Sequence, residues 1–412
     1  MRPDREQILV RPPDRPIDVS IGLPASKSIS NRALIIASLC GSRNALHGLS
    51  DADDTVRLDR LLRERPRLMD CGAGGTTLRF LLAWAAIQEG SEHVITGIPR
   101  LLERPHDDLV NALRAIGGEV VHAAEGFLVK GKRLKGGKVT MISPRSSQFV
   151  SALLLVAPYT EEGIEILWKG ERNSEPYVRM TCSMMERSGA VVDLREDRIG
   201  VRPGTYSMDR YSVPLDRSAA SFWYEIAAFS GHARIELPGL FDDGLQGDAE
   251  AAEFWRNWVS TDVMGTGTVL RSRERRSIDR PKFDLRNCPD LFQPLALSCA
   301  GLGVEASFTG LGTLPLKETD RIAATGKVLS IFGGSIQESD QLFLISPIND
   351  LRIPDPVIID PEGDHRMAMS AAPLALLTGG IRILDPVVVE KSYPRFWEHL
   401  RAAGFSITPV TV

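Results

Sequence analysis

Residues 23–39 read LPASKSISNRALIIASL. The first half of this stretch is polar and carries two cations, Lys27 and Arg32, whereas the second half is apolar enough for a protein core. An α-helix leaves its first N–H groups unpaired, and its dipole places partial positive charge there, so serines at its start are ordinary N-caps. Cations oppose that dipole, at a cost of up to about 1 kcal/mol each. The stretch therefore predicts a buried helix whose first turn faces an anion such as phosphate or carboxylate.

The same pattern, a polar cluster that runs into an apolar helical segment, recurs along the chain. Further copies start at residues 75, 146, 217, 289 and 364, at steps of 71, 71, 72 and 75, after a shorter first step of 49 from residue 26. A fixed period predicts repeated supersecondary units that share a core. A linear repeat scaffold stays open as an alternative, although the period is longer than that of the usual solenoids.

A second series of segments, more amphipathic than the first, interleaves with it, and several members end in Gly. Apolar residues at i, i+3, i+4 and i+7 predict helices here, with the Gly as a left-handed cap. Short runs rich in β-branched residues, such as GIEILW and ARIEL, lie between the two series and predict strands. The chain thus reads as six α/β units of roughly 70 residues, each with two helices and several strands.

Composition narrows the class of protein. The 412 residues suggest two or three domains, and 43% hydrophobic with 25% charged residues is typical of globular proteins. A net charge of −4 argues against a nucleic-acid or anionic-membrane partner held by bulk charge. The start MRPDREQILV has no apolar core of a secretory signal, and no apolar run reaches the roughly 18 residues of a membrane span.

Cysteine and histidine usage gives no sign of a metal site. The five cysteines are scattered without a CxxC pair, and the seven histidines are dispersed without an HExxH motif. We expect small buried cysteines in a reducing cytoplasm, with neither a disulfide framework nor a bound metal. The loop GAGGTT (72–77) is neither a dinucleotide fingerprint nor a Walker A loop.

The helix starts hold many cations and few carboxylates. In the second half of the chain these are the cations Lys317, Arg321, Arg366 and Lys391, the carboxylates Asp290, Glu318, Asp320 and Asp364, and His365; Lys27, Arg32 and Arg79 add three cations from the first half. If the helix starts converge, such a site suits two anionic substrates and one or two groups that move protons.

At this point the chain closely resembles the 5-enolpyruvylshikimate-3-phosphate synthase (3-phosphoshikimate 1-carboxyvinyltransferase) family of enolpyruvyl transferases. The matching motifs run in family order from about residue 22 to residue 397 and together are highly specific. They are SKSISNRAL, GGTTLR, PRLLERP, SSQF, SEPY, the PD at 289–290, LKETDR, DHRMAM and EKSYP.

The resemblance implies a fold of two inside-out α/β domains, each of three βαβαββ repeats, with the active site in the interdomain cleft. Residues 22–216 are expected to form one domain, and residues 1–21 with 217–412 the other. The chain is expected to cross between them at hinges near 21 and 216.

The implied reaction moves the enolpyruvyl group of phosphoenolpyruvate to the 5-hydroxyl of shikimate 3-phosphate and releases phosphate, on the route to chorismate and the aromatic amino acids. It uses no metal or organic cofactor. The resemblance also implies a cytoplasmic monomer without nucleic-acid or membrane partners.

Site residues follow from the resemblance motif by motif. Asp290 is expected to take the 5-hydroxyl proton, and Glu318, with Lys27 nearby, to move a proton at the methylene carbon. The remaining expected contacts to shikimate 3-phosphate are Lys27, Ser28, Arg32, Ser146, Ser147, Gln148, Ser174, Tyr177 and Lys317. Those to phosphoenolpyruvate are Lys27, Gly75, Arg100, Gln148, Arg321, Arg366 and Lys391. His365 is expected near the site without an assigned role.

The chain departs from the family pattern at a few positions near the expected site. Ala73 stands for the common Asn of the glycine loop, Phe80 for a Pro after Arg79, and Thr313 for an Asn. These changes bear on contacts to shikimate 3-phosphate and on the shape of the loop. Two alternatives stay open: UDP-N-acetylglucosamine enolpyruvyl transferase, and a non-catalytic six-repeat binding paralogue.

Overall fold

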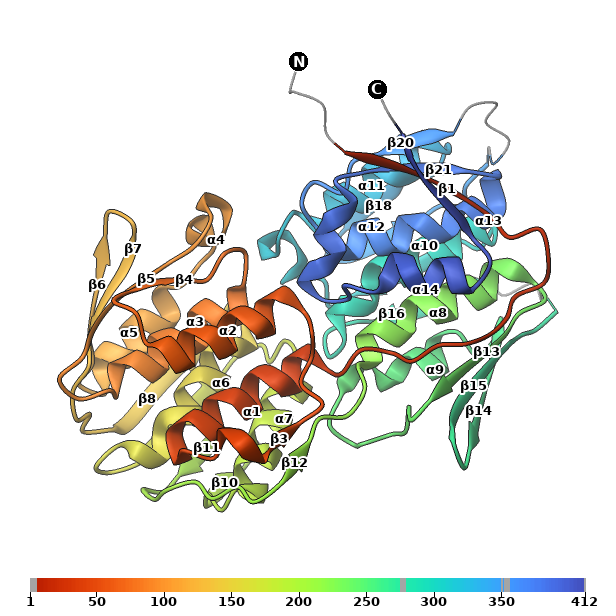
Figure 1. Cartoon of the computed structure of the whole chain (residues 1–412). Helices are drawn as coiled ribbons and strands as arrows, with labels where there is room; N and C mark the ends of the chain where they lie inside the picture. Colours follow the sequence, from red (N-terminus) through yellow and green to blue (C-terminus); the bar gives the residue numbers. More distant parts are fainter. Residues whose placement is uncertain (1–5, 275–278, 350, 352–355, 411–412) are drawn as a thin grey trace. The chain divides into compact units, whose positions relative to one another are not determined.

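The computed structural model describes residues 6–274, 279–349, 351 and 356–410 and divides into two compact units. The N-terminal unit comprises Ala25–Pro214 together with Gly244–Gln246. The C-terminal unit comprises Met1–Pro24, Leu215–Asp243 and Gly247–Val412. The first strands therefore belong with the last half of the chain, which Figure 1 shows by the dark red strand β1 beside the blue β21.

One sheet pattern recurs through both units. The sheet of β8 to β11 is an example, with the strand order β10-β11-β9-β8. Strands β8 and β9 pair in parallel, and β11 pairs antiparallel with both β9 and β10. The same order is found in five four-stranded sheets of the described residues. A βαβαββ unit produces this order, because a parallel pair needs a helical crossover and the last two strands form a hairpin.

Two complete repeats lie in the N-terminal unit. The first consists of β4 (Leu68–Asp70), α3 (Gly75–Ala86), β5 (Glu92–Thr96), α4 (Pro99–Glu103), α5 (Asp107–Ala115), β6 (Glu119–Ala123) and β7 (Gly126–Lys130). The second consists of β8 (Gly137–Ile142), α6 (Ser147–Val156), η2 (Ala157–Tyr159), β9 (Ile164–Lys169), α7 (Glu175–Arg187), β10 (Val192–Leu194) and β11 (Arg198–Val201).

The third repeat of this unit is shortened. It consists of α1 (Lys27–Cys40), η1 (Arg43–Ala45), β3 (Leu46–His47), α2 (Asp53–Glu64) and β12 (Tyr211–Ser212), and its sheet is the parallel pair of β3 and β12. Its third and fourth strands are missing within the described residues. This explains why the first step of the sequence period is 49 residues rather than about 71.

The C-terminal unit holds three complete repeats. The first is β2 (Asp18–Ser20), α8 (Arg217–Ser230), β13 (Arg234–Pro238), η3 (Gly247–Glu250), α9 (Ala251–Phe254), β14 (Val259–Met264) and β15 (Gly267–Ser272). The second is β16 (Lys282–Asp284), η4 (Pro289–Leu291), α10 (Phe292–Gly301), β17 (Ala306–Thr309), η5 (Leu314–Leu316), α11 (Arg321–Ile331), β18 (Ile336–Ser339) and β19 (Leu342–Ile345). The third is β20 (Val357–Ile359), α12 (His365–Ala371), η6 (Ala372–Leu374), α13 (Ala375–Thr378), β21 (Ile381–Leu384), η7 (Pro386–Lys391), α14 (Phe396–Ala402), β22 (Ser406–Val410) and β1 (Gln7–Arg11).

The helices that begin with the polar clusters form the core of each unit. Every residue of α10 and α12 is buried, as are nearly all residues of α3, α6 and α8. A helix that is apolar all round must be surrounded by other elements, whereas the amphipathic α2, α5 and α7 bury one face each. The two series of helices predicted from the sequence are therefore confirmed as central and outer helices.

Left-handed glycines end the outer helices, as the sequence predicts. Gly117, Gly189, Gly333 and Gly404 follow α5, α7, α11 and α14 with φ between 73° and 100°.

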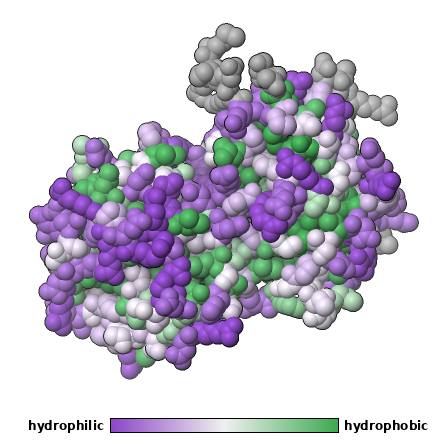
Figure 2. Space-filling view, viewed as in Figure 1, coloured by the Kyte–Doolittle hydropathy of each residue, from purple (hydrophilic) through white to green (hydrophobic). Residues whose placement is uncertain are grey.

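The cysteines are free, and four of the five are buried. Figure 2 shows hydrophilic side chains interspersed with smaller hydrophobic areas over one face of the molecule. Within the described residues, no helix is both long and apolar enough to cross a membrane.

Candidate active site

The N-terminal unit gathers several expected site residues at the starts of its central helices. Lys27, the first residue of α1, donates from Nζ to Asp54 Oδ2 at 2.9 Å. The Asp54 side chain is 3% exposed and lies in the first turn of α2. The cation that opposes the dipole of α1 thus has a carboxylate partner inside the same unit. Sequence reasoning missed Asp54, although an acidic pair at a helix start is a visible signal.

Arg32 lies deeper in α1 and is 1% exposed. Its Nε donates to Thr181 Oγ1 at 2.7 Å, and its other nitrogens donate to the carbonyls of Ser28 and Tyr177 and to Ser151 Oγ. Burial lowers the pKa of Arg32 to about 10. Hydroxyls and carbonyls neutralise no charge, so a substrate anion nearby would stabilise this guanidinium.

One departure from the family pattern lies against Arg32. The Arg32 guanidinium carbon lies 5.4 Å from the centre of the Phe80 ring, and Phe80 is buried in α3. A cation above an aromatic face is attracted by the ring quadrupole. The Phe in place of the more common Pro therefore helps to fix Arg32.

The start of α6 presents the expected serine and glutamine residues. Ser146 caps the helix, because its Oγ accepts from the backbone N–H of Gln148 at 3.2 Å. The side chain of Gln148 accepts from Arg79 Nη1 at 2.5 Å, which joins α6 to α3. Ser174, which precedes α7, has φ 60° and ψ 36°, a left-handed conformation that is uncommon for Ser. Such backbone strain is frequent at functional sites.

The structure separates the two arginines of PRLLERP. Arg100 lies on the short helix α4, with its side chain 47% exposed and 3.5 Å from Glu103. Arg104, the C-cap of α4, is 9% exposed, and its Nη1 lies 2.8 Å from where a Cβ on Gly75 would stand. The arginine that meets the start of α3 is thus Arg104, whereas Arg100 was expected there. Both arginines fit the motif, and only the fold of the turn distinguishes them.

In the C-terminal unit, Asp290 is held by cations from two other helix starts. Its Oδ1 accepts from Arg321 Nη1 at 2.8 Å and lies 3.8 Å from Lys317 Nζ. Its Oδ2 accepts from Arg366 Nη2 at 2.8 Å. Burial works to raise the pKa of Asp290, but the cations around it, Arg366 first, outweigh burial and hold the pKa well below its ordinary value. Asp290 is therefore ionised at neutral pH, as a proton acceptor must be.

Glu318 shares the same cationic cluster. Its Oε1 accepts from Lys391 Nζ at 2.7 Å and its Oε2 from Arg321 Nη2 at 3.2 Å. Arg321 is 2% exposed and also donates from Nε to the fully buried Asp364 Oδ2 at 2.7 Å. Burial works to lower the pKa of Arg321, but the carboxylates around it, Asp364 first, hold it above its ordinary value. Arg321 is a permanent cation that orients three carboxylates.

Two further expected residues lie beside this cluster. His365 begins α12 and is 2% exposed, with Nδ1 3.6 Å from Asp364 Oδ1. Thr313 precedes η5 and is 9% exposed, and its Oγ1 is buried without a hydrogen-bond partner among the described residues. An unsatisfied buried hydroxyl at this position can accept or donate a hydrogen bond to a ligand.

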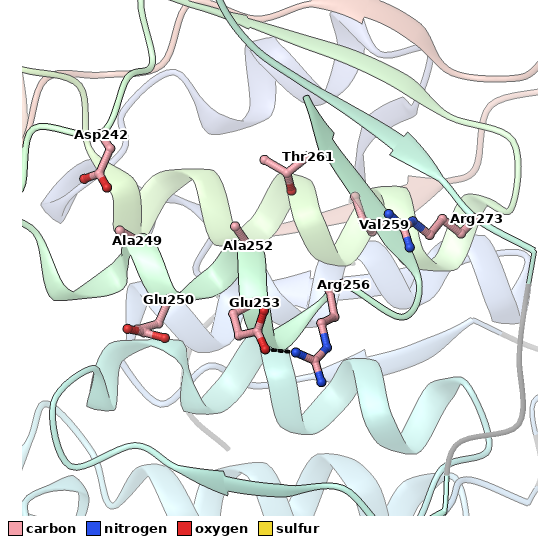
Figure 3. A pocket seen from close by; sticks show the side chains of 9 residues that line it. All are labelled: Asp242, Ala249, Glu250, Ala252, Glu253, Arg256, Val259, Thr261 and Arg273. Carbon is pink, nitrogen blue, oxygen red and sulfur yellow. Dashed lines mark hydrogen bonds and ion pairs between the residues drawn. The ribbon is translucent and has the colours of Figure 1, made fainter. Parts of the chain in front are cut away.

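The expected residues thus fall into two groups, one within each unit, and the exposed Arg100 lies apart from both. No group of three or more metal-ligating side chains is found in the described part of the chain. A surface pocket of about 430 Å³ near α9 is lined by none of the expected residues (Figure 3). It carries both signs of charge, from Asp242, Glu250, Glu253, Arg256 and Arg273.

Comparisons with known proteins show which proteins this chain resembles. Residues 58–400 match the family model described as EPSP synthase (3-phosphoshikimate 1-carboxyvinyltransferase). The chain is 40% identical over 397 residues to a 3-phosphoshikimate 1-carboxyvinyltransferase of Bacteroides fragilis. The aligned segment covers 95% of this chain and 96% of that protein. It is 35% identical over 421 residues to the protein of that name from Methanoculleus marisnigri, covering 94% of this chain and 97% of that protein.

Solved structures show the same fold. An EPSP synthase structure from Acinetobacter baumannii matches with a TM-score of 0.77 and 21% identity, over 98% of this chain and 100% of that one. This likeness confirms the expected α/β fold class. The match over residues 58–400 and the 40% identity over 95% of this chain show that the chain belongs to the EPSP synthase (3-phosphoshikimate 1-carboxyvinyltransferase) family.

Proposed function

We propose that this protein transfers the enolpyruvyl group of phosphoenolpyruvate to the 5-hydroxyl of shikimate 3-phosphate and releases phosphate, on the route to chorismate. In the addition step, Asp290 takes the hydroxyl proton, the hydroxyl oxygen bonds to C2 of phosphoenolpyruvate, and C3 gains a proton from Glu318. In the elimination step, C3 returns a proton, the double bond reforms and the C2–O bond to phosphate breaks. C3 returns its proton to Glu318, and the proton that Asp290 took from the hydroxyl passes to the leaving phosphate, so both carboxylates regain their starting protonation states.

The observation that carries this proposal is the position of two carboxylates on one arginine. Asp290 and Glu318 both bind Arg321, at 2.8 and 3.2 Å. Two proton-transfer groups are therefore held side by side among cations that an anionic substrate can engage in their place. When phosphate or carboxylate displaces these carboxylates from Arg321 and Arg366, both become available for proton transfer.

Each proposed substrate is assigned residues from both units. Arg321, Arg366 and Lys391 of the C-terminal unit bind phosphoenolpyruvate, and we assign Arg104 rather than Arg100 to the same substrate because Arg104 lies against Gly75. Shikimate 3-phosphate is assigned to Ser28, Arg32, Ser146, Ser147, Gln148, Ser174, Tyr177 and Lys317. Lys27 and Gln148 are assigned to both substrates.

The proposal treats the two units as the two domains of the family and the crossings as hinges. The crossing segments are paired through their backbones: Ser26 N–H donates to the Pro214 carbonyl and Asp216 N–H to the Pro24 carbonyl, at 2.8 and 2.9 Å. Paired crossings can bend together while each unit stays rigid. Small-angle scattering with shikimate 3-phosphate is expected to show a smaller radius of gyration, and an unchanged radius would contradict hinge closure.

We further propose that the protein acts as a cytoplasmic monomer that needs no metal or cofactor. Phosphate release, measured in a coupled assay without added metal or cofactor, tests the activity. Release that requires both phosphoenolpyruvate and shikimate 3-phosphate is expected. Release with UDP-N-acetylglucosamine as acceptor instead would identify the sister enzyme. No release with either acceptor would identify a non-catalytic paralogue.

A further inference from the structure

Asp248, in the short helix η3, is a buried carboxyl group that none of the assigned roles uses. It is 2% exposed, and its Oδ2 accepts from the Ser218 hydroxyl at the start of α8. Its Oδ1 is buried without a hydrogen-bond partner among the described residues. An ionised carboxylate with an unsatisfied oxygen is costly to bury, whereas the neutral acid is much less so.

The charges around Asp248 connect it to the proposed active site. Two carboxylates act on it, Asp290 in η4 and Asp216 at the start of α8, together with one cation, Arg366 at the start of α12. The thiol of Cys288 also lies within electrostatic range. Arg366 is already bound to Asp290 at 2.8 Å, so it cannot fully neutralise a second carboxylate. Burial first, and then the charge of Asp290, raise the pKa of Asp248 to about 7.

We propose that Asp248 is a positioning residue whose proton sets how strongly Arg366 attracts the phosphoenolpyruvate anion. This inference rests on the proposed function. While Asp248 is neutral, it adds no negative charge that competes with the substrate for Arg366. When Asp248 loses its proton to solvent, Arg366 faces a second negative charge and its attraction for the substrate weakens.

The coupling runs in both directions. An anion that arrives at Arg366 adds negative charge close to Asp248, so substrate binding favours the protonated carboxyl group. By thermodynamic linkage, protonation must then favour binding by the same factor. Each pKa unit of coupling corresponds to about a tenfold change in affinity.

The KM for phosphoenolpyruvate between pH 6 and pH 8.5, at saturating shikimate 3-phosphate, tests the inference. Between these pH values the KM of the wild type is expected to rise by a factor about tenfold larger than does the KM of Asp248→Asn, because the Asn side chain stays neutral at every pH. The ionisation of the substrate affects both proteins equally and cancels in this comparison. An equal rise in the two proteins would overturn the inference.

Glu250→Gln is the matched control, since it removes one negative charge two residues away. Glu250 is exposed and lines the surface pocket of Figure 3. Its variant is expected to keep the wild-type rise in KM; loss of the rise here would mean that general surface charge, rather than Asp248, is responsible.

Ser218→Ala is a second variant, in case Asp248→Asn does not fold. It removes a donor that stabilises the charged form, so the rise should move to higher pH, and an unmoved rise would count against the inference.

Thermal unfolding without substrates gives a readout that does not depend on turnover. Because the folded-state pKa of about 7 lies above the ordinary value of 3.8, the native protein binds one more proton than the unfolded chain between these values. The stability of the wild type therefore falls relative to Asp248→Asn as pH rises through this window. The Tm of Asp248→Asn relative to that of the wild type should rise between about pH 4 and pH 7 and then stay constant. A difference that is the same at every pH would contradict the claim that Asp248 is protonated in the folded protein. Absence of turnover with both substrates would instead overturn the proposed function.

Discussion

Arg104 lies against Gly75 so closely that a methyl group on Gly75 would stand 2.8 Å from Arg104 Nη1. Gly75 is the first residue of α3, and Arg104 is the C-cap of α4. Because Gly75 has no side chain, the start of the central helix α3 has room for the guanidinium of Arg104, which follows α4. An anion at this position would meet both the helix N–H groups and Arg104.

Gly75→Ala is expected to raise the KM for phosphoenolpyruvate about tenfold with little change in Tm. The added methyl meets only the end of a flexible side chain, which can move at small cost but then no longer faces the helix start. Gly97→Ala is the contrasting variant, because its methyl would meet the backbone carbonyl of Gly72 at 2.5 Å and should lower Tm. A Gly75→Ala protein with unchanged KM would show that this helix start is not used for phosphoenolpyruvate.

The two arginines of PRLLERP are expected to differ in their effects. Arg104→Ala should raise the KM for phosphoenolpyruvate at least tenfold, because it removes a charge-assisted donor worth about 1.5–3 kcal/mol. Arg100→Ala should stay within about twofold of the wild type, since an exposed pair with Glu103 contributes little. Steady-state kinetics of both variants checks this, and the reverse order of effects would restore the expectation drawn from the sequence.

Asp54→Asn is expected to destabilise the protein by about 1–3 kcal/mol and to reduce turnover, because Lys27 loses the carboxylate that orients it. Asp53→Asn is the control on the same helix. Its side chain is 48% exposed and lies 3.5 Å from Arg57, so the change should stay within about 0.5 kcal/mol. Urea unfolding measures both values, and equal losses would remove the special role of the Lys27–Asp54 pair.

Glu225→Gln should stabilise the protein increasingly as pH rises. Glu225 lies in α8 with both carboxyl oxygens buried and without hydrogen-bond partners among the described residues, and burial raises its pKa well above 4.5. The folded wild type therefore keeps its proton at pH values where the unfolded chain ionises, so its stability falls as pH rises above about 4.5. Urea unfolding between pH 4 and pH 7 checks the slope, and a stability difference independent of pH would contradict it.

The sequence predicts the repeats well because each repeat buries one helix completely, and such helices are apolar on all sides. The starts of α1, α3, α6, α8, α10 and α12 follow from this pattern. Two features could not be predicted from local pattern. The repeat that holds α1 and α2 lacks two strands. The N-terminal strand β1 instead completes the last repeat of the chain, because it pairs with β21 and β22.

The candidate site was predictable in residue type and not in every position. The motifs point to Asp290, Glu318 and Arg321, and the structure brings these three together. The choice between Arg100 and Arg104 depends on which way a five-residue helix turns, and local sequence does not specify that. Asp248 was missed because a single Asp in a polar stretch shows its burial only in the folded chain.

The most direct test of the catalytic assignment is phosphate release by Asp290→Ala with both substrates saturating. Removal of the carboxylate takes one competing anion away from Arg321 and Arg366, so the KM for phosphoenolpyruvate should be unchanged or lower. The proton acceptor is lost, so kcat should fall by about 10² to 10⁴-fold while shikimate 3-phosphate still raises Tm. A kcat near that of the wild type would contradict the assignment of Asp290 as the base.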